Sequence, residues 1–582
     1  MKMKKAFSIA LLMCVLLAAL CPIAMGEQRD NIRENSTIYQ LELSELGRSV
    51  YSEDEGGVYG PEDFIVLEDE TALVLDTQNR RIIVCKDSGI SYIDISQHCL
   101  WPSRIEYSDG KIYVLDAKAS SVLVFSTDGK IVQKMGLPDG VNGYIVVDLQ
   151  ENDGNIILRT DFDGNYMIKG NSFVPVSINE SAYTDNQRVL HIKLRNGSEI
   201  TLNTAHTGAD VVYSDDRYAV LECIELVPDC PYVMGELTLR RFSTSSGKLI
   251  GCEYLDSDEW FSMPSKYTSA DRNGAVYYMA CYADKIQIKK ACFSKTPADS
   301  RMDEIRQEAM IKTRELIASE KNTAPNYRIT KKRNQVLSTA QSYANHTWTL
   351  REYNKHTYGN AQLYHAYANA SDGTRFTGVP YCRGGYHTVS QFDQYLNTVY
   401  QSPYKYCAGN VNDQGYQNGT TGVDCSGFVS RAYGISHYTT SGLAGYGNAY
   451  TTGYSAYDMK PMDMWVASGY HVMLHVGYAN NNTRVYVYDA SREAVGCVSY
   501  RYWSYAGIQS HNFMKRSPWH LSCSGYVNST YTQTPTTHYH ECSVCGMKYD
   551  EAPHTWVTSG TNKVCTVCGR TVAVQSAPGA VE

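Results

Sequence analysis

Gly-Val-Asp-Cys-Ser-Gly-Phe-Val, residues 422–429, places a cysteine at the start of a predicted helix. Apolar side chains follow at the spacing of an amphipathic helix, at Phe428, Val429, Ala432 and Tyr433. Cys425 therefore falls in the first helical turn, where free backbone N–H groups and the helix dipole favour a thiolate. Because the thiolate is the reactive form of cysteine, this stretch predicts a nucleophile. The alternative is a buried cysteine that packs as a small hydrophobe or joins a disulfide.

A cysteine nucleophile needs a base, and the segment His471–Tyr478 offers two histidines. Its residues alternate as in a β-strand, with His471 and His475 on the same face. A five-residue turn and a returning strand bring His471 opposite roughly residue 491, close to Asp489. A carboxylate there would fix the imidazole tautomer and stabilise its protonated form. From the residues alone, His475 remains the rival base, about 7 Å along the strand.

Four segments resemble the NlpC-type family of papain-like cysteine peptidases, which cleave bacterial cell-wall peptides. The family's nucleophile motif is similar to residues 424–428, and its His-Val-Gly-Ile-Tyr-Val-Gly strand matches 471–477 without a gap. Its Pro-Tyr-x-x-Gly-Gly segment resembles 380–385. Lys460–Asp463 looks like its Lys-Pro-Gly-Asp turn, with methionine in place of the glycine.

The resemblance implies a role for each matched residue. Cys425 would attack an amide carbonyl, His471 would be its base, and Tyr381 would lie against the thiol. Asp489 takes the third polar position, where the family often has histidine. Asp424 and Ser426 flank the nucleophile, and residues at these positions can bind a substrate amine in relatives. The alternative is that they cap the helix.

Residues 346–523 are therefore expected to form a papain-like α+β domain, in which the helix of the cysteine packs on the sheet of the histidine. The resemblance implies cleavage of a γ-D-glutamyl amide in a peptidoglycan stem peptide, with no cofactor for catalysis. Two alternatives stay open. One is an amidase-type relative that acts on another amide, and the other is a surface adhesion or scaffold protein with a vestigial peptidase fold.

The N-terminus is typical of a secretory signal. Three lysines precede an apolar run, Ala6–Leu20, and small residues at 24–26 offer a cleavage site. We expect residues 1–26 to be removed and the protein to reach the cell wall or surface of a bacterium; an uncleaved membrane anchor is the alternative. Loss of three lysines moves the net charge from -8 to -11, which argues against nucleic acid as a partner.

The first half of the 582-residue chain contains an internal repeat. Val74–Asp76 recurs as Val114–Asp116, and Ile83–Cys85 recurs as Leu123–Phe125, both 40 residues later. A period near 40 with several strands per unit predicts propeller blades. Residues 56–295 hold about six such lengths and resemble NHL-type six-bladed β-propellers. A two-sheet β-sandwich is the alternative. Such a domain would be a binding platform, with cell-surface proteins or glycans as candidate partners.

Two further segments connect the predicted domains. Residues 296–345 are expected to form a helical spacer, with helices at Arg301–Lys321 and Lys331–Tyr343. Residues 524–537 are rich in serine and threonine and predict a linker.

The C-terminal residues 538–571 contain two Cys-x-x-Cys-Gly knuckles that are 19 residues apart. This spacing predicts a zinc-ribbon module with a structural zinc ion. The predicted ligands are Cys542, Cys545, Cys565 and Cys568. So short a module buries little core, so metal binding would supply its folding free energy. Two disulfides are the alternative, and three histidines lie near enough in sequence to replace a ligand: His538, His540 and His554.

Sixteen cysteines would remain after cleavage, since Cys14 and Cys21 of the 18 lie in the signal. In an oxidising compartment some could pair, and Cys223 with Cys230 is one candidate disulfide.

Overall fold

A computed structural model describes residues 36–46, 50–54, 57–152, 154–178, 180–185, 187–202, 206–293, 300–320, 329, 331–449, 456–492, 495–518, 521, 530–534, 536–541, 548–559 and 562–573. The predicted signal peptide, half of the predicted linker and two of the predicted zinc ligands, Cys542 and Cys545, lie outside the described residues. Among the helices that are described, none is both long and apolar enough to span a membrane.

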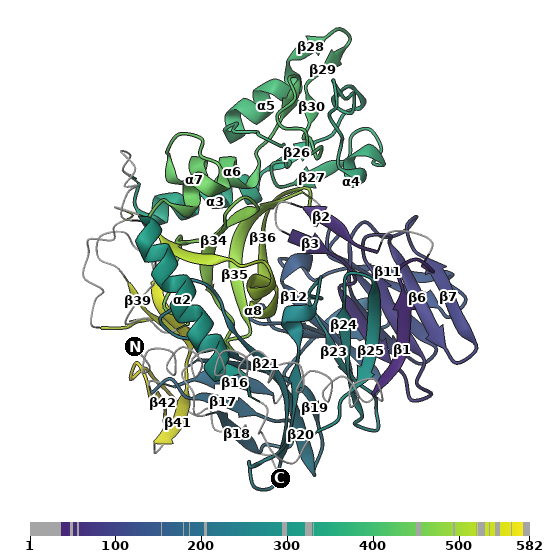
Figure 1. The fold of residues 1–582 in the computed structure, drawn as a ribbon, viewed down its shortest axis with the longest axis vertical. Coiled ribbons are helices and arrows are strands. Elements are labelled where there is room, and N and C mark those ends of the chain that lie inside the picture. The colour runs from purple at the N-terminus through teal and green to yellow at the C-terminus, as the bar shows by residue number, and fades with distance from the viewer. Residues whose placement is uncertain are drawn as a thin grey trace, which may run out of the picture.

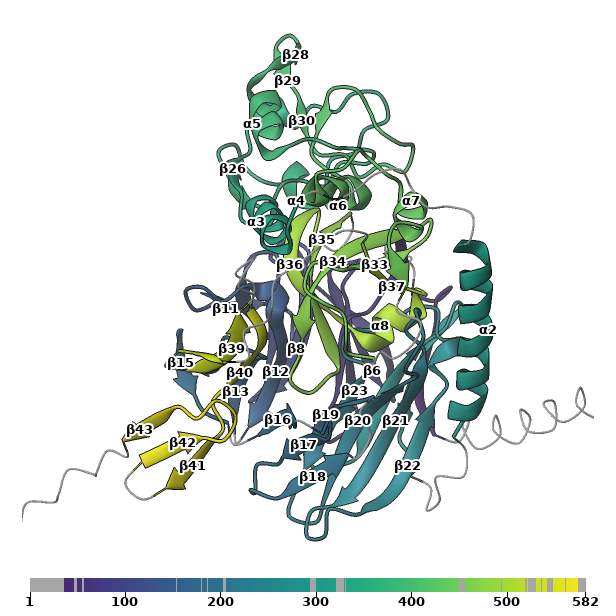
Figure 2. The same cartoon turned by 90° about the vertical axis from the view of Figure 1, so that its left-hand side faces the viewer.

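Six antiparallel sheets follow one another between Asp63 and Lys290 and form a β-propeller-like domain (Figures 1 and 2). They comprise β4 (Asp63–Val66), β5 (Ala72–Asp76), β6 (Arg81–Lys86) and β7 (Gly89–Asp94); β8 (Pro102–Ser108), β9 (Lys111–Asp116), β10 (Ser121–Ser126) and β11 (Ile131–Gly136); β12 (Val146–Asn152), β13 (Asn155–Thr160), β14 (Asn165–Lys169) and β15 (Ser172–Val176); β16 (Ser181–Thr184), β17 (Leu190–Lys193) and β18 (Glu199–Leu202); β19 (Thr207–Ser214), β20 (Tyr218–Leu226), β21 (Gly235–Ser243) and β22 (Leu249–Leu255); and β23 (Thr268–Ala270), β24 (Val276–Cys281) and β25 (Lys285–Lys290) with β1 (Thr37–Glu42).

The last sheet closes the propeller-like domain with a strand from its beginning. β1 pairs antiparallel with β25, so that Leu41 lies opposite Ile286. The first strands of neighbouring sheets also pack together, with β8 against both β4 and β12, and β23 against β4. These contacts favour blades around an axis over a two-sheet sandwich. The domain thus takes in Thr37–Glu42, ahead of the predicted boundary at residue 56.

The 40-residue repeat corresponds to equivalent strands of the first two sheets. Its aspartates, Asp76 and Asp116, end β5 and β9 and accept backbone N–H groups of nearby loops. Asp116 binds the N–H groups of Leu100 and Trp101 at 2.7 and 3.1 Å, and Asp76 binds Asn79 N at 3.3 Å. The repeated aspartate is therefore a loop-fixing residue, because it satisfies donors that would otherwise be buried without partners.

An α+β domain follows the propeller-like domain. Its six-stranded sheet has the order β32-β37-β33-β34-β35-β36 and is covered on one face by helices (Figure 1). The strands and main helices are β32 (Asn448–Ala449), β33 (Met464–Ala467), β34 (His471–Tyr478), β35 (Arg484–Ser491), β36 (Cys497–Ser504), β37 (Met514–Ser517), α3 (Arg333–Ala344), α6 (Cys425–Tyr433), α7 (Thr440–Ala444) and α8 (Tyr505–Ser510).

Small elements between α3 and α6 form the outer part of this domain (Figure 1). They are β26 (Thr347–Thr349), α4 (His365–Ala368), β27 (Arg375–Thr377), α5 (Val389–Asn397), β28 (Val399–Gln401), β29 (Tyr404–Lys405), β30 (Cys407–Ala408) and β31 (Thr420–Thr421). The predicted spacer helix is present as α2 (Met302–Glu320), which packs against β21. The C-terminal strands are β38 (Thr532–Gln533), β39 (Thr537–Glu541), β40 (Lys548–Pro553), β41 (Trp556–Ser559), β42 (Asn562–Cys565) and β43 (Thr571–Ala573).

Both faces of the six-stranded sheet are buried. Val472 and Leu474 point into a core shared with α3 and α6. Met473 and Trp465 point into a second core, shared with β20, β21 and β24 of the propeller-like domain. The sheet is therefore the middle layer between the helices and the propeller, and alternate residues of each strand face different partners.

The proposed disulfide between Cys223 and Cys230 is wrong, because both cysteines are buried free thiols. Cys223 lies on β20 and packs in a sheet core, whereas Cys230 packs beneath α2 beside Met302 and Ala309.

Candidate functional site

Asp424 caps the helix that carries the predicted nucleophile. Its Oδ1 accepts the N–H of Gly427 at 2.5 Å and the hydroxyl of Ser426 at 3.0 Å. Its Oδ2 accepts the N–H of Gly384 at 2.9 Å. Asp424 and Ser426, predicted as substrate-binding residues, are thus engaged in capping the helix and fixing a loop. Both are buried.

Cys425 is the first residue of α6, as predicted from the octapeptide. Its side chain is buried in the core between the helices and the sheet, the core that also holds Val472 and Tyr381. Tyr381 reaches this position because its backbone pairs with Val423, two residues before the cysteine. The structure therefore brings the predicted nucleophile and the predicted tyrosine into one layer.

His471 and Asp489 form the pair that the hairpin register predicted. His471 Nε2 lies 2.5 Å from Asp489 Oδ1. β34 and β35 pair with Leu474 opposite Tyr488, a register that continues to His471 opposite Ser491. The predicted contact between the imidazole and the carboxylate is confirmed.

Asp489 also binds two side chains that the sequence did not suggest. Its Oδ2 accepts Arg501 Nε at 2.7 Å and Trp503 Nε1 at 3.3 Å. Burial alone would raise the pKa of Asp489, but the charges of Arg501 and His471 hold it below its usual range. Arg501 reaches in turn toward Tyr59 of the propeller-like domain, with Nη2 3.5 Å from its hydroxyl. Asp489 is therefore an ionised carboxylate at the boundary between the two domains.

His471 and Cys425 lie on opposite faces of the sheet. The His471 ring packs near Trp503 and Phe513, at centroid distances of 6.3 and 6.2 Å, on the propeller side. Its Nδ1, the nitrogen not used by Asp489, is buried and has no hydrogen-bond partner among the residues that the structure describes. The thiol–imidazole hydrogen bond expected of a cysteine hydrolase is therefore not formed between these two residues.

His475, the rival base, also faces away from the core that holds the thiol. It is fully buried on the same strand face as His471, and Trp465 Nε1 donates to its Nδ1 at 3.3 Å. Burial, with a smaller contribution from the charge of Arg333, lowers its pKa to about 3. His475 is thus a neutral core histidine.

A third histidine, which the sequence reasoning did not consider, lies on the helix side of the sheet. His437 Nε2 is 3.6 Å from Asp424 Oδ1, and its ring stacks on Tyr386 at 4.9 Å. Its side chain is 31% exposed. His437 is therefore a partly accessible imidazole that contacts the residue next to Cys425. In the sequence, only its position four residues after Tyr433, the last apolar residue of the predicted helix, could have pointed to it.

Met462 replaces the glycine of the family turn and takes the backbone conformation that glycine favours, with φ of 67°. Its side chain is fully buried in the helix-side core, and its carbonyl accepts the hydroxyl of Tyr433 at 2.9 Å. The turn therefore keeps its shape without glycine, because burial of the methionine offsets the strain of a left-handed residue.

Four ligand groups converge in the C-terminal module. Atoms of His538, His554, Cys565 and Cys568 that could bind a metal lie within 4.8 Å of one another. Two of the four predicted zinc ligands, Cys565 and Cys568, belong to this cluster, and two histidines take part beside them. Two thiolates and two imidazoles suit a tetrahedral zinc ion.

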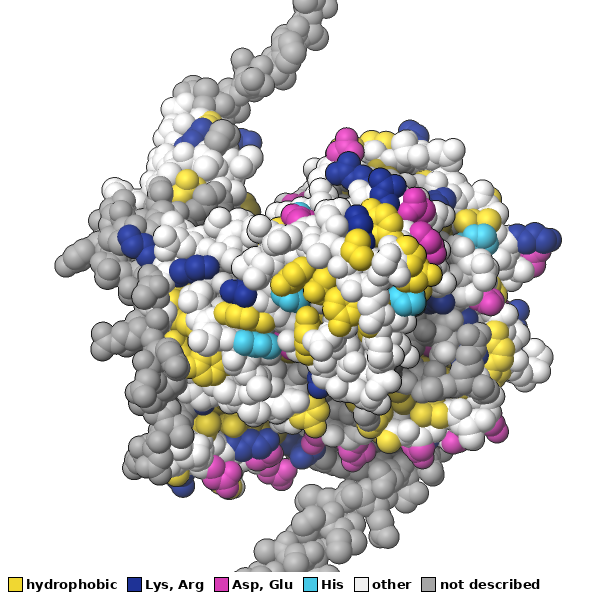
Figure 3. Space-filling model, turned by 90° about the horizontal axis from the view of Figure 1, so that it is seen from above, with side chains coloured by type: hydrophobic (Ala, Val, Ile, Leu, Met, Phe, Trp, Pro, Cys, Tyr) yellow, Lys and Arg dark blue, Asp and Glu magenta, His cyan; other side chains and the backbone are white. Residues whose placement is uncertain are grey.

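Seen from above, over the outer part of the α+β domain, hydrophobic and histidine side chains gather near the middle of the face (Figure 3). Exposed aromatic residues between α3 and α6 include Tyr404 and Tyr416, which are 39% and 42% exposed.

No protein-family model matches this chain, and no curated protein matches it. Solved structures similar to it include a streptogramin B lyase, with 12% identity, a TM-score of 0.29, and coverage of 44% of this chain and 97% of the other. Virginiamycin B lyase from Staphylococcus aureus is 11% identical, with a TM-score of 0.28 and coverage of 43% of this chain and 98% of the other. A member of the DUF4221 family from Bacteroides vulgatus is 11% identical, with a TM-score of 0.29 and coverage of 45% of this chain and 98% of the other. We assign the propeller-like fold from the strand pairings of this chain.

Proposed function

We propose that the protein is a secreted cysteine hydrolase that cleaves γ-D-glutamyl amide bonds of peptidoglycan stem peptides, with a papain-like catalytic domain. The observation that carries the proposal is the place of Cys425, the first residue of a capped helix within the sequence Asp-Cys-Ser-Gly-Phe. The first turn of a helix lowers the pKa of a thiol and supplies N–H groups for an oxyanion. Tyr381, which is buried in the same core as Cys425, supports the same proposal.

The chemistry would proceed in two steps. The thiolate of Cys425 attacks the amide carbonyl, the C–N bond breaks, and the leaving amine takes a proton from an imidazolium. Water then hydrolyses the thioester and restores the thiol. The proton donor is either His437, which lies on the helix side of the sheet, or His471, the base that the family resemblance implies.

The nucleophile is tested by incubating purified stem peptides with the wild type and the Cys425→Ala variant, followed by mass spectrometry. We expect the wild type to release products with a new free diamino-acid amine and the variant to release none. Cys292→Ala, which alters an exposed thiol, is the control and should cleave at the wild-type rate. Free lactyl-sugar ends in place of free amines would instead indicate the amidase-type alternative.

The base is tested by comparing His437→Ala with His471→Ala. Loss of a general base lowers the rate by about 10²–10⁴-fold. If His437 is the base, only its variant loses activity at unchanged thermal stability. If both variants retain the wild-type rate, neither histidine is the base.

A second candidate function is a non-catalytic surface scaffold with a vestigial peptidase fold. The observation that favours it is the burial of His471 between the sheet and the propeller-like domain, where Asp489 links it to Arg501. In that role the pair would hold two domains together. Peptide cleavage that persists unchanged in Cys425→Ala, or is absent from the wild type, supports this candidate over the first.

A structural zinc ion is the cofactor that we propose for the C-terminal module, held by His538, His554, Cys565 and Cys568. Four protein ligands leave no open coordination position, so the ion would stabilise the module rather than react. The module and the propeller-like domain are then candidate sites for binding cell-surface proteins or glycans, and no role for nucleic acid is proposed.

A further inference from the structure

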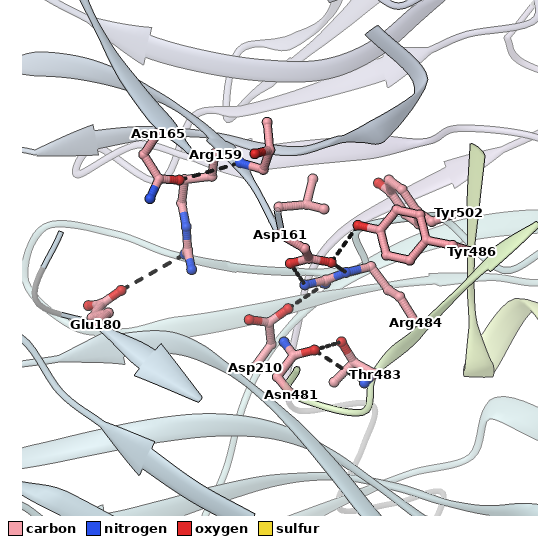
Figure 4. A network of polar contacts seen from close by, with 12 residues as sticks. Arg159, Asp161, Asn165, Glu180, Asp210, Asn481, Thr483, Arg484, Tyr486 and Tyr502 are labelled. Carbon is pink, nitrogen blue, oxygen red and sulfur yellow. Dashed lines mark hydrogen bonds and ion pairs between the residues drawn. The ribbon is translucent and has the colours of Figure 1, made fainter. Parts of the chain in front are cut away.

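The boundary between the two large domains follows the paired strands β35 and β36. At one end of this pair, Arg484 binds Asp161 and Asp210 of the propeller-like domain, at 3.0 and 2.6 Å (Figure 4). At the other end, Ser491 of β35 lies opposite Cys497 of β36. Ion pairs therefore hold one end of the boundary, whereas a thiol lies at the other.

Cys497 faces Lys118, which follows β9 in the second sheet of the propeller-like domain. Lys118 Nζ lies 3.2 Å from Cys497 Sγ and donates to the carbonyl of Val495 at 2.7 Å. The ring centroids of Tyr364 and Tyr367 lie 5.7 and 5.6 Å from the same nitrogen. The lysine nitrogen is thus fixed beside the sulfur, although the two residues are 379 positions apart in the chain.

The sulfur is enclosed by the rest of its surroundings. Cys497 is 2% exposed and packs in one cluster with Trp101, and its thiol donates to the carbonyl of Thr377 at 3.6 Å. A Cβ atom on Gly378 would lie 2.8 Å from this sulfur, so the chain passes so close only because the residue is glycine. Lys118 is only half-buried, so the pair adjoins solvent at the lysine.

A thiol in this position has a nitrogen as its partner for oxidation chemistry. Peroxides oxidise cysteine to a sulfenic acid, which condenses with a nearby thiol or nitrogen. The nitrogen of Lys118 is held at contact distance from the sulfur, so its attack is intramolecular and is favoured over attack by a molecule from solution. The buried surroundings also restrict access of a second peroxide to the sulfur.

We propose that Cys497 and Lys118 form a redox modification site, in which a hydroperoxide such as hydrogen peroxide links Sγ to Nζ as a sulfenamide. In the first step the S–O bond forms, the O–O bond breaks and water leaves, so the sulfur loses two electrons to the peroxide. Nζ, after it has lost one proton to solvent, then attacks the sulfur. The S–N bond forms, the S–O bond breaks, and the hydroxyl group leaves as water with a second proton of Nζ.

The link would join the two large domains covalently. A cross-link between residues so far apart restricts the unfolded chain, so the oxidised protein should be more stable than the reduced one. The proposal goes beyond the hydrolase, because it uses none of the residues that are proposed for catalysis.

The test treats the full folded chain with hydrogen peroxide, alkylates the remaining thiols and identifies the peptides by mass spectrometry. We expect the peptides of Lys118 and Cys497 to be joined, with a mass that is two hydrogens below their sum, and dithiothreitol to separate them. When the chain is unfolded in urea before oxidation, the joined pair should be at least about tenfold less abundant, because the two residues are no longer held together.

Lys118→Arg keeps the positive charge but replaces the amine with a guanidinium group that stays protonated, so this variant should form no link. The matched control is Lys130→Arg, which alters an exposed lysine between β10 and β11 of the same sheet and should link like the wild type. Dithiothreitol should lower the melting temperature of the oxidised wild type and leave that of peroxide-treated Lys118→Arg unchanged.

Three outcomes would overturn the proposal: no joined peptides from the folded wild type, a link that persists in Lys118→Arg, or equal linking of the folded and unfolded chains. A joined pair that carries one additional oxygen would exclude the direct S–N bond. Should Lys118→Arg fail to fold, the comparison of folded and urea-unfolded wild type decides by itself. Cys425→Ala should link like the wild type, so failure of the hydrolase proposal leaves this one intact.

Discussion

At the scale of single residues, His475 shows how burial changes a titratable group. Its pKa of about 3 lies below the ordinary value of 6.5, so the folded protein holds it neutral while the unfolded chain protonates it below pH 6.5. The unfolded state therefore binds more protons as the pH falls from 6.5 toward 3, and stability falls over that window. Above pH 6.5 the histidine is neutral in both states and contributes no pH dependence.

We predict that His475→Gln removes part of this acid sensitivity. Between pH 7 and pH 5 the free energy of unfolding of the wild type should fall by about 2 kcal/mol more than that of the variant. The glutamine oxygen can still accept the indole N–H of Trp465, so the packing is largely kept. Urea unfolding at both pH values measures the difference. Parallel losses in the two proteins would contradict a neutral His475.

At the scale of elements, two substitutions at the start of α6 can distinguish a structural role of Asp424 from a role in substrate binding. Asp424→Ala removes the acceptor for Gly427 N and should lower the free energy of unfolding by about 1–2 kcal/mol. Asp424→Asn keeps an N-cap acceptor and should cost much less stability. Thermal melts of both variants check this prediction. If Asp424→Asn cleaves stem peptides at the wild-type rate, capping accounts for the residue and the predicted substrate role fails.

The C-terminal strands are too short to bury much apolar surface, so we predict that a metal ion maintains this module. The purified protein should contain one zinc ion per chain by elemental analysis, and Cys565→Ser should lose it. Chelation should make the C-terminal segment sensitive to protease while the rest of the chain is unaffected. The matched control is Cys292→Ser, which should retain the ion. A metal-free wild type with two disulfides would contradict the prediction.

At the scale of the whole molecule, Arg484 joins the two large domains. Its side chain is 12% exposed and pairs with Asp161 and Asp210, both of the propeller-like domain. Arg484→Gln would leave two half-buried carboxylates without their cation, and we predict a loss of up to about 3 kcal/mol, the lower end of the cost of breaking a buried pair. A calorimetric melt in which the wild type unfolds in one transition and the variant in two would show that the domains are coupled here. Arg217→Gln, at an exposed ion pair, should change stability little.

The residue patterns were sufficient for local structure. Turn length and alternation set the register that pairs His471 with Asp489, and the apolar spacing after Cys425 marks α6. Closure of the propeller-like domain by Thr37–Glu42 was not predictable, since that strand pairs with one that lies far along the chain. Arg501 could have been found from the register, because its partner Val487 is two residues from Asp489.

The amino-acid pattern was enough to predict the elements whose contacts lie close together along the chain, namely the helix at Cys425, the hairpin of His471 and the 40-residue repeat. The face of the sheet that α6 covers, and with it the direction of His471 toward the propeller-like domain, depends on how the domains pack. Both faces of this sheet are buried. Val472 and Leu474 are as apolar as Met473 and Trp465, so alternation separates the two faces without indicating which of them the helix covers.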